Sequence, residues 1–351
     1  MILGANGRAG RVIARALSTR EHAVILVGRD EDALSTLAST LQCKSRTVVA
    51  GDLKAIIAAI ADHRPAVVVN TIGPFGETAL PIIDGCPAGT HYLDLANEMQ
   101  VFESMMVAEP RIKERRQCVV TGAGWGVLAT ESIVLKLCAD QPPAKRVRID
   151  NLASVKADGT LGDTVAATIV DNLSYGGRCY QDGRLKRVRM GYQPDRFAVP
   201  DGTNAVTGGA STADLEAARR ASGASDIVAG AELAPTSPVI AALAGFIGAL
   251  SRFGFIRRQL QRSFAKMPNT PPKRNTSWAR AVVEWPGDRR RVGWLRAGDA
   301  YDFLAKASAE TATRLADQKG KPGVYTPGGL FGAELAELAG AMFILEDAGS
   351  A

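Results

Sequence analysis

The chain has 351 residues and a formal net charge of +6, with 42 Lys and Arg against 36 Asp and Glu. Its length predicts two domains or one large one, while 46% hydrophobic residues exclude a disordered chain. The small charge excess argues against nucleic acid as a partner. The chain has five cysteines, none in a C-x-x-C pair, and three histidines. These numbers argue against a disulfide framework and against a metal site.

The first eleven residues place a glycine-rich turn between an apolar stub and a helical pattern. Gly4, Gly7 and Gly10 follow a G-x-x-G-x-x-G spacing, and residues 12–17 have helical apolar spacing. Such glycines permit a tight turn and a close approach of the backbone to pyrophosphate, which the helix N-terminus then stabilises. The spacing alone also fits a turn in any α/β protein. The predicted cofactor contacts in this turn are Gly4, Asn6, Gly7, Arg8, Ala9 and Gly10.

The first strand is short for a central strand. Only three residues precede Gly4, whereas strands average about five or six residues. A clipped strand and a native start upstream of Met1 both remain open.

A second strand is predicted over residues 23–27, and Gly28, Arg29 and Asp30 follow it. This position, roughly 20 residues beyond the glycine turn, is where the residue that contacts the adenosine ribose belongs. The Arg29 guanidinium suits a 2′-phosphate, so the sequence favours NADP over NAD. Because Asp30 follows Arg29, NAD stays open as the cofactor. The alternative for Arg29 is a solvated charge on a loop, with no role in cofactor binding.

The next two units repeat the strand–turn–helix pattern. A strand over 47–50 and a helix over 54–62 flank Asp52 and Leu53, where Asp52 either accepts from the adenine amino group or caps the helix. The β-branched run 66–70 is typical of a strand buried on both faces. Ligands in open α/β sheets sit beyond the carboxyl ends of such strands. The expected nicotinamide floor is therefore Thr71, Gly73, Pro74 and Phe75.

The rest of the chain predicts a second, different domain. After a strand over 118–121 and a helix over 127–138, Pro142 and Pro143 mark a boundary. The expected strands near 146–155, 185–190, 226–233, 278–285 and 291–297 form a mostly antiparallel sheet, with helices over 164–175 and 301–318. We therefore expect an α/β fold: a Rossmann-type parallel sheet domain at 1–140 and an α+β domain at 141–327. A C-terminal helix within 328–351 is expected to return to the first domain.

An apolar segment at 239–250 is followed by five basic residues up to Lys266. It is too short to span a membrane. A buried or subunit-interface helix, a wall of an apolar pocket, and membrane association through 239–262 are the three interpretations, in that order. We expect a homo-oligomer, as a homodimer. With no signal peptide ahead of the first motif, we expect a cytoplasmic protein.

Several motifs together resemble the saccharopine dehydrogenase-like (saccharopine reductase-like) NAD(P)-binding family, over nearly the whole chain. They are 4–10, 27–29, 69–75, 89–94, 122–126, 158–160, 182–185, 321–327 and 331–334. The resemblance implies an NADP(H)-dependent oxidoreductase and is specific for fold and cofactor, not for substrate. Ala96, Asn97 and Glu98 depart from the Gly-Glu that the family usually has after Asp94.

A nicotinamide site beside a second domain implies hydride transfer in the cleft between them. The candidate catalytic residues are His91, Tyr92 and Asp94, expected on a loop after a strand, where His91 or Tyr92 supplies a proton. The alternative is that Tyr92 and Asp94 hold that loop by hydrogen bonds. Trp125 and Thr160 are expected to shape the substrate pocket.

Three functional hypotheses remain open from the sequence. The first is an NADPH-dependent oxidoreductase acting on a small molecule, with either saccharopine-type C–N chemistry or reduction of C=C or C=O in an apolar metabolite. Polycarboxylate substrates need paired arginines, for which Arg178, Arg184 and Arg187 are candidates. The second is a non-catalytic, redox-responsive NADP-binding partner protein, and the third is a cofactor-assisted isomerase or epimerase.

Overall fold

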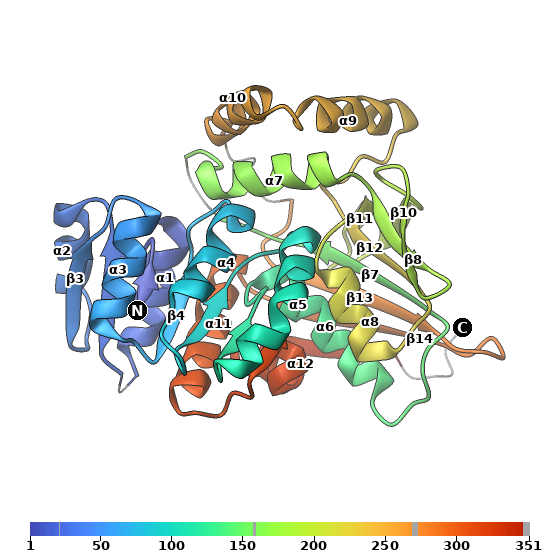
Figure 1. The fold of residues 1–351 in the computed structure, drawn as a ribbon. Coiled ribbons are helices and arrows are strands. Elements are labelled where there is room, and N and C mark those ends of the chain that lie inside the picture. The colour runs from blue at the N-terminus through green and yellow to red at the C-terminus, as the bar shows by residue number, and fades with distance from the viewer. Residues whose placement is uncertain (21, 157–158, 269–272, 347–351) are drawn as a thin grey trace.

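The computed structural model describes residues 1–20, 22–156, 159–268 and 273–346, which form two β-sheets surrounded by helices (Figure 1). The elements of the first sheet and its helices are β1 (Ile2–Leu3), α1 (Arg8–Ser18), β2 (Val24–Gly28), α2 (Glu31–Ser39), β3 (Ser45–Val49), α3 (Leu53–His63), β4 (Val67–Asn70), α4 (Phe75–Gly85), β5 (His91–Asp94), α5 (Met99–Glu114), β6 (Cys118–Val120) and β15 (Gly323–Tyr325).

The elements of the second half are α6 (Trp125–Cys138), β7 (Arg146–Leu152), α7 (Asp163–Tyr175), β8 (Arg178–Gln181), β9 (Arg184–Arg187), β10 (Asp195–Ala198), β11 (Asn204–Ala210), α8 (Asp214–Ser222), β12 (Asp226–Ala231), α9 (Pro238–Leu250), α10 (Gly254–Ala265), β13 (Ser277–Glu284), β14 (Arg290–Ala297), α11 (Ala300–Ala316), α12 (Pro327–Phe331), α13 (Glu334–Leu338) and β16 (Met342–Leu345).

The first sheet is parallel and has the order β15-β6-β5-β4-β1-β2-β3. Strand β1 lies between β2 and β4, so the strand order reverses there. The loops after β1 and β4 therefore leave the same edge side by side, which is where open α/β sheets bind ligands. This arrangement confirms the expected Rossmann-type sheet.

The second sheet has the path β10-β11-β12-β7-β13-β14-β16, with the β8–β9 hairpin attached at β12. Its pairs are antiparallel except β12 with β7. The mostly antiparallel sheet is thus confirmed. The hairpin turn falls on Asp182 and Gly183, whose φ angles of 52° and 73° are those that a tight hairpin turn requires.

The C-terminal segment differs from the expected single helix at 328–351. Gly332 and Gly340 lie just beyond the short helices α12 and α13, with positive φ angles of 81° and 93° that glycine adopts without strain and that interrupt a continuous helix. The chain then forms β16 against β14 of the second sheet, whereas β15, within the expected second domain, pairs with β6 of the first. Residues 347–351 lie outside the described part.

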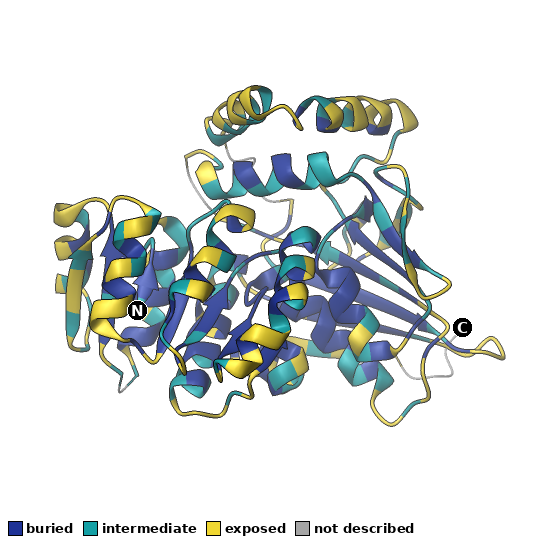
Figure 2. Cartoon of the chain, viewed as in Figure 1, coloured by how far each residue is buried: buried dark blue, intermediate teal, exposed yellow. Residues whose placement is uncertain are grey.

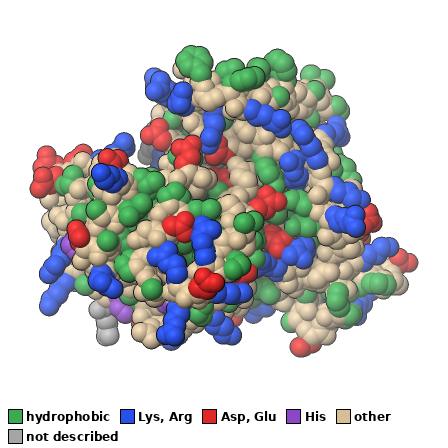
Figure 3. Space-filling view, viewed as in Figure 1, with side chains coloured by type: hydrophobic (Ala, Val, Ile, Leu, Met, Phe, Trp, Pro, Cys, Tyr) green, Lys and Arg blue, Asp and Glu red, His purple; other side chains and the backbone are tan. Residues whose placement is uncertain are grey.

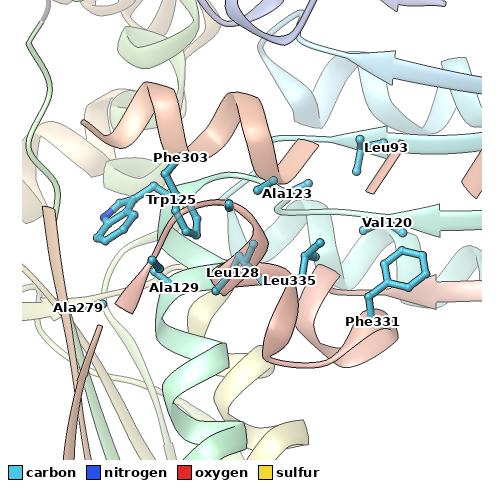
Figure 4. Close-up of a cluster of buried hydrophobic side chains, with 14 of the residues drawn as sticks. Leu93, Val120, Ala123, Trp125, Leu128, Ala129, Ala279, Phe303, Phe331 and Leu335 are labelled. Carbon is cyan, nitrogen blue, oxygen red and sulfur yellow. The ribbon is translucent and has the colours of Figure 1, made fainter. Parts of the chain in front are cut away.

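The two sheets share one hydrophobic core. Figure 4 shows Leu93 and Val120 of the first sheet, Trp125 and Leu128 of α6, and Phe303 of α11 within one buried cluster. Ala279 of the second sheet belongs to the same cluster. Because α6 and α11 contribute to both sides, the relative placement of the sheets depends on well-packed apolar side chains.

The first interpretation of 239–250 was a buried or subunit-interface helix, and helix α9 is not buried within this chain. Ala241 and Gly248 are its buried residues, and they face α7, where a side chain at Gly248 would overlap the Leu173 carbonyl oxygen. Figure 2 shows α9 and α10 as largely exposed helices above α7. Within the described ranges, no helix is both long and apolar enough to cross a membrane.

Candidate functional site

The glycine-rich turn connects β1 to α1 as expected. Gly4 has a φ of 73°, and Gly7 is the N-cap of α1, where no described side chain accepts from the first-turn N–H groups. A side chain at Gly10 would overlap the Gly4 carbonyl oxygen. Gly10 therefore allows the helix to pack closely on the turn, whereas exposed Gly7 leaves the uncapped N–H groups open to an anion.

A cavity of about 1420 Å³ opens at this turn and extends to the second sheet. The expected site residues that line it are Gly4, Asn6, Gly7, Arg8, Ala9, Arg29, Asp52, Leu53, Thr71, Gly73, Phe75 and Thr160. Its lining does not include Gly10, Asp30, Pro74, His91, Tyr92, Asp94 or Trp125. The tertiary structure thus brings most of the expected cofactor residues to one space and excludes the three expected catalytic residues.

The two carboxylates expected near the adenosine both cap helices. Asp30 Oδ1 accepts from the Ala33 N–H of α2 at 3.0 Å, and Asp52 Oδ1 accepts from the Ala55 N–H of α3 at 2.8 Å. Asp52 also lines the cavity, while Asp30 does not. Arg29, exposed and on the cavity, is therefore the charged group presented there at the end of β2.

The loop after β4 is fixed to the end of β1. Thr71 Oγ1 donates to the Leu3 carbonyl oxygen at 2.8 Å, and Gly73 faces α7, where a methyl group would lie 2.8 Å from Thr164 Cγ2. Pro74 is the N-cap of α4 rather than a lining residue. The loop therefore forms a closely packed edge of the cavity against the second half of the chain.

A direct contact joins the glycine turn to the segment before α7. Arg8 Nη2 donates to the Thr160 carbonyl oxygen at 2.9 Å, and its guanidinium lies 5.8 Å from the ring centroid of Tyr301. Thr160 thus lines the cavity. Its carbonyl oxygen is also hydrogen-bonded to Arg8, which belongs to the half that carries the glycine turn. Asp158, in the same resemblance motif, lies outside the described residues.

His91, Tyr92 and Asp94 do not form the expected loop, because they are strand β5 itself. His91 lies at the amino end of β5, away from the glycine turn, where its Nδ1 accepts from the Cys118 N–H at 3.1 Å, and burial lowers its pKa. The Tyr92 side chain is buried inside the fold, and burial raises its pKa well above the ordinary value. The expected loop position is therefore wrong, and because none of the three residues lines the cavity, the geometry gives their catalytic assignment no support.

Tyr92 and Asp94 instead position the loops around the cavity. Tyr92 Oη donates to Asp94 Oδ2 at 3.0 Å and accepts from Asn70 Nδ2 at 3.0 Å, and Asn70 Oδ1 accepts from the Ile72 N–H. Asp94 Oδ1 accepts from Thr121 Oγ1 at 2.7 Å. These bonds tie the ends of β4, β5 and β6 together, so they support the alternative of a structural role.

The buried carboxyl group of Asp94 should make the free energy of unfolding depend on pH. Burial raises its pKa to about 6, above the ordinary 3.8. Between these values the folded chain holds a proton that the unfolded chain has released, so the free energy of unfolding should fall as the pH rises from about 4 to about 6, by on the order of 2 kcal/mol. Urea unfolding across this range measures it. Asp94→Asn should remove this part of the slope.

The control for this prediction is Asp84→Asn, which changes a half-exposed aspartate that pairs with Arg111. It should leave the slope as in wild type. An Asp94→Asn protein with an unchanged slope would show that Asp94 ionises at an ordinary pH in the folded chain.

Trp125 was expected to shape the substrate pocket, but it is a buried residue at the start of α6 that does not line the cavity. Its ring packs edge-on against Phe303, and its Nε1 donates to Asn151 Oδ1 at 2.6 Å. Asn151 lines the cavity. Trp125 therefore affects the cavity indirectly, by holding the side chain of Asn151. The alternation of residues along the strand does not by itself mark Asn151 as a site residue.

The second-half lining of the cavity is largely apolar. Its apolar side chains include Val165, Ile169, Leu173, Met190, Leu233 and Ile240. Asp163, Glu232, Lys273 and Tyr301 add charged groups and a phenol, and the last three had no signal in the sequence because distant segments bring them together. Uncharged polar side chains come from Asn151, Thr164, Thr168, Asn172, Ser211 and Thr212. Arg178, Arg184 and Arg187 are not part of this lining.

Comparison with known proteins agrees with this architecture. Residues 4–113 match a family model described as NAD(P)H-binding, and curated proteins give no sequence match. Apo saccharopine dehydrogenase (L-Glu forming) from Saccharomyces cerevisiae is similar in structure, with a TM-score of 0.61 and 12% identity over 99% of both chains.

Myo-inositol dehydrogenase from Lactobacillus casei, solved with NAD(H) and myo-inositol, has a TM-score of 0.45 and 10% identity over 100% of this chain and 97% of its own. An oxidoreductase domain protein from Kribbella flavida has a TM-score of 0.44 and 14% identity over 97% of this chain and 94% of its own. Of these three structures, saccharopine dehydrogenase has the TM-score above 0.5, and the conclusion on the fold rests on it. The chain therefore shares the fold of saccharopine dehydrogenase, and its first sheet lies in the part that matches the NAD(P)H-binding model.

Proposed function

We propose that this protein is an NADPH-dependent oxidoreductase that transfers a hydride between the cofactor and a small apolar metabolite. The observation that supports it best is one continuous cavity, which begins at the glycine turn, passes Arg29 and the 71–75 loop, and continues along apolar side chains of the second half. Cofactor and substrate would then share one space between the two sheets.

The proposed cofactor position follows from the charges and open N–H groups of the lining. The uncapped start of α1 at Gly7, Arg8 and Ala9 suits the pyrophosphate, and Arg29 suits the 2′-phosphate of NADP. Thr71, Gly73 and Phe75 would lie along the nicotinamide. When bound, the nicotinamide supplies or accepts the hydride, and the chain's own residues orient the substrate and exclude water.

The proposed substrate class follows from the opposite end of the cavity. Burying a carboxylate without a cationic partner is costly, and among the described lining residues the second half contributes no arginine and one lysine, Lys273, which lies 3.7 Å from Glu232. Ile169, Leu173 and Met190 offer apolar surface instead. We therefore favour C=O or C=C reduction in an apolar metabolite over a polycarboxylate such as saccharopine.

Ile169→Asp should abolish turnover of an apolar substrate while NADPH binding stays as in wild type. Ile169 lies on α7, half-buried against the cavity, and a carboxylate there would have to be desolvated by an apolar substrate. Steady-state kinetics and NADPH titration measure the two effects. Ile169→Leu is the matched control and should keep most activity. If Ile169→Asp lost NADPH affinity to the same extent as turnover, the proposed separation of the cavity into a cofactor end and a substrate end would be wrong.

The deciding experiment is a screen of NADPH oxidation against imines, ketones and enoyl compounds of graded polarity. Turnover of apolar ketones or enoyl compounds is the expected result. Tight NADP(H) binding without turnover of any of them would favour a non-catalytic binding protein. Conversion of a substrate without net cofactor oxidation would favour an isomerase or epimerase.

We place the reaction in the cytoplasm. All five cysteines are free, and three of them are buried. Burial raises the pKa of the Cys86 and Cys118 thiols to about 12, so neither forms the reactive thiolate at neutral pH. Unpaired, unreactive cysteines are typical of a reducing compartment.

A further inference from the structure

An exposed apolar face covers the outer side of α9 and the turn into α10. We call it the α9–α10 face and define it by Val239, Leu243, Phe246, Phe253 and Phe255, whose exposed fractions are 78%, 57%, 63%, 65% and 75%. The helical spacing of Val239, Leu243 and Phe246 puts them on one side of α9, opposite Ala241 and Gly248, which pack on α7. Figure 3 shows hydrophobic side chains gathered there, at the top of the molecule.

The segment that carries this face is strongly basic. Residues 233–268 contain five basic residues and no Asp or Glu. Arg257 is held by Asp171 at 2.9 Å and Glu77 at 3.3 Å. Arg252, Arg258, Arg262 and Lys266 are exposed and form no ion pair with any other described residue. Uncompensated cations thus border the apolar face.

A second, smaller cavity lies beside α9, with a volume of about 410 Å³. Arg187, Arg189 and Arg252 line it, and none of its described lining residues carries a carboxylate. Its other wall is apolar, from Pro238, Ala241, Ala242, Gly245 and Ala249 of α9. Three guanidinium groups beside an apolar wall suit a phosphate that is attached to a hydrocarbon chain.

We propose that the α9–α10 face docks on an anionic lipid membrane, with its apolar side chains among the acyl chains and Arg187, Arg189 and Arg252 on lipid phosphates. A helix with exposed Phe and Leu beside Lys and Arg is the kind that lies in a membrane interface, and anionic headgroups attract such cations. A symmetric contact with a second copy would bring two segments of like charge together, each with the four cations named above, and this opposes association through this face.

Vesicle flotation of the full chain tests this proposal, using phosphatidylcholine with and without phosphatidylglycerol. Wild type should float with the anionic vesicles and much less with the neutral ones. The double variant Phe246→Ser and Phe253→Ser should bind anionic vesicles at least about tenfold more weakly. Arg187→Gln with Arg189→Gln should weaken binding roughly fivefold for each charge removed, and the loss should shrink at high salt.

Matched control variants separate this face from general surface effects. Val107→Ser with Leu338→Ser removes two exposed apolar side chains elsewhere, at 82% and 56% exposure, and Arg289→Gln with Arg290→Gln removes two exposed charges from a distant hairpin. Both should bind vesicles as wild type does. Equal losses in these controls, or a wild type that does not bind anionic vesicles, would overturn the proposal. Sedimentation velocity showing a dimer that Phe246→Ser converts to monomers, without vesicle binding, would assign the face to a second copy.

Discussion

Replacing Gly7 with valine should abolish NADP(H) binding and leave the fold intact. Gly7 is exposed at the N-cap of α1 in extended backbone, with φ −74° and ψ 170°, a conformation that valine adopts readily. Its added side chain would occupy the space over the first-turn N–H groups. Losing two charge-assisted hydrogen bonds there lowers affinity by roughly a hundredfold or more. Isothermal titration with NADPH and a thermal melt measure both results.

Gly10→Ala is the contrasting control, three residues away in the same turn. Its Cβ would overlap the Gly4 carbonyl oxygen and crowd the Ala5 backbone, so we expect a loss of roughly 1–3 kcal/mol in stability. Gly7→Val, whose Cβ would lie 3.1 Å from the same oxygen without overlapping it, should lose less stability than Gly10→Ala. If Gly7→Val binds NADPH as tightly as wild type, the glycine turn is not the pyrophosphate site.

Arg29→Ala should lose NADPH affinity and keep NADH affinity. Arg29 is exposed at the end of β2 and lines the cavity beside the glycine turn. A guanidinium paired with a 2′-phosphate contributes roughly 1.5–3 kcal/mol, which corresponds to a roughly tenfold to hundredfold preference. Asp30, whose carboxylate would repel that phosphate, caps α2 instead of lining the cavity. Dissociation constants for both cofactors decide the matter.

Arg46→Ala serves as the control for Arg29→Ala, because Arg46 is exposed on the neighbouring strand β3 and does not line the cavity. It changes the net charge equally and should leave both dissociation constants unchanged. A wild type that prefers NADH would refute the NADP assignment. An equal loss of both cofactors in Arg29→Ala would mean that the arginine supports the site as a whole and not the 2′-phosphate.

The elements of the first half could be predicted because their signals are local. The spacing of Gly4, Gly7 and Gly10 specifies a strand–turn–helix unit within eleven residues, and the continuous apolar run ending at Asn70 specifies a buried strand. The position of Arg29 follows from the same repeat. In each case the residues that determine the conformation are close neighbours in the chain.

Only the tertiary structure decided which residues face the cavity. The stretch from His91 to Asp94 contains groups suited to proton transfer, but pairing with β4 and β6 makes it an interior strand and turns Tyr92 and Asp94 toward each other. The apolar composition of α9 likewise suggested burial, yet its contact with α7 covers a narrow stripe and leaves Phe246 exposed. Glycine spacing and hydrophobic periodicity are properties of a segment, whereas burial and cavity lining depend on which distant segments pack against it.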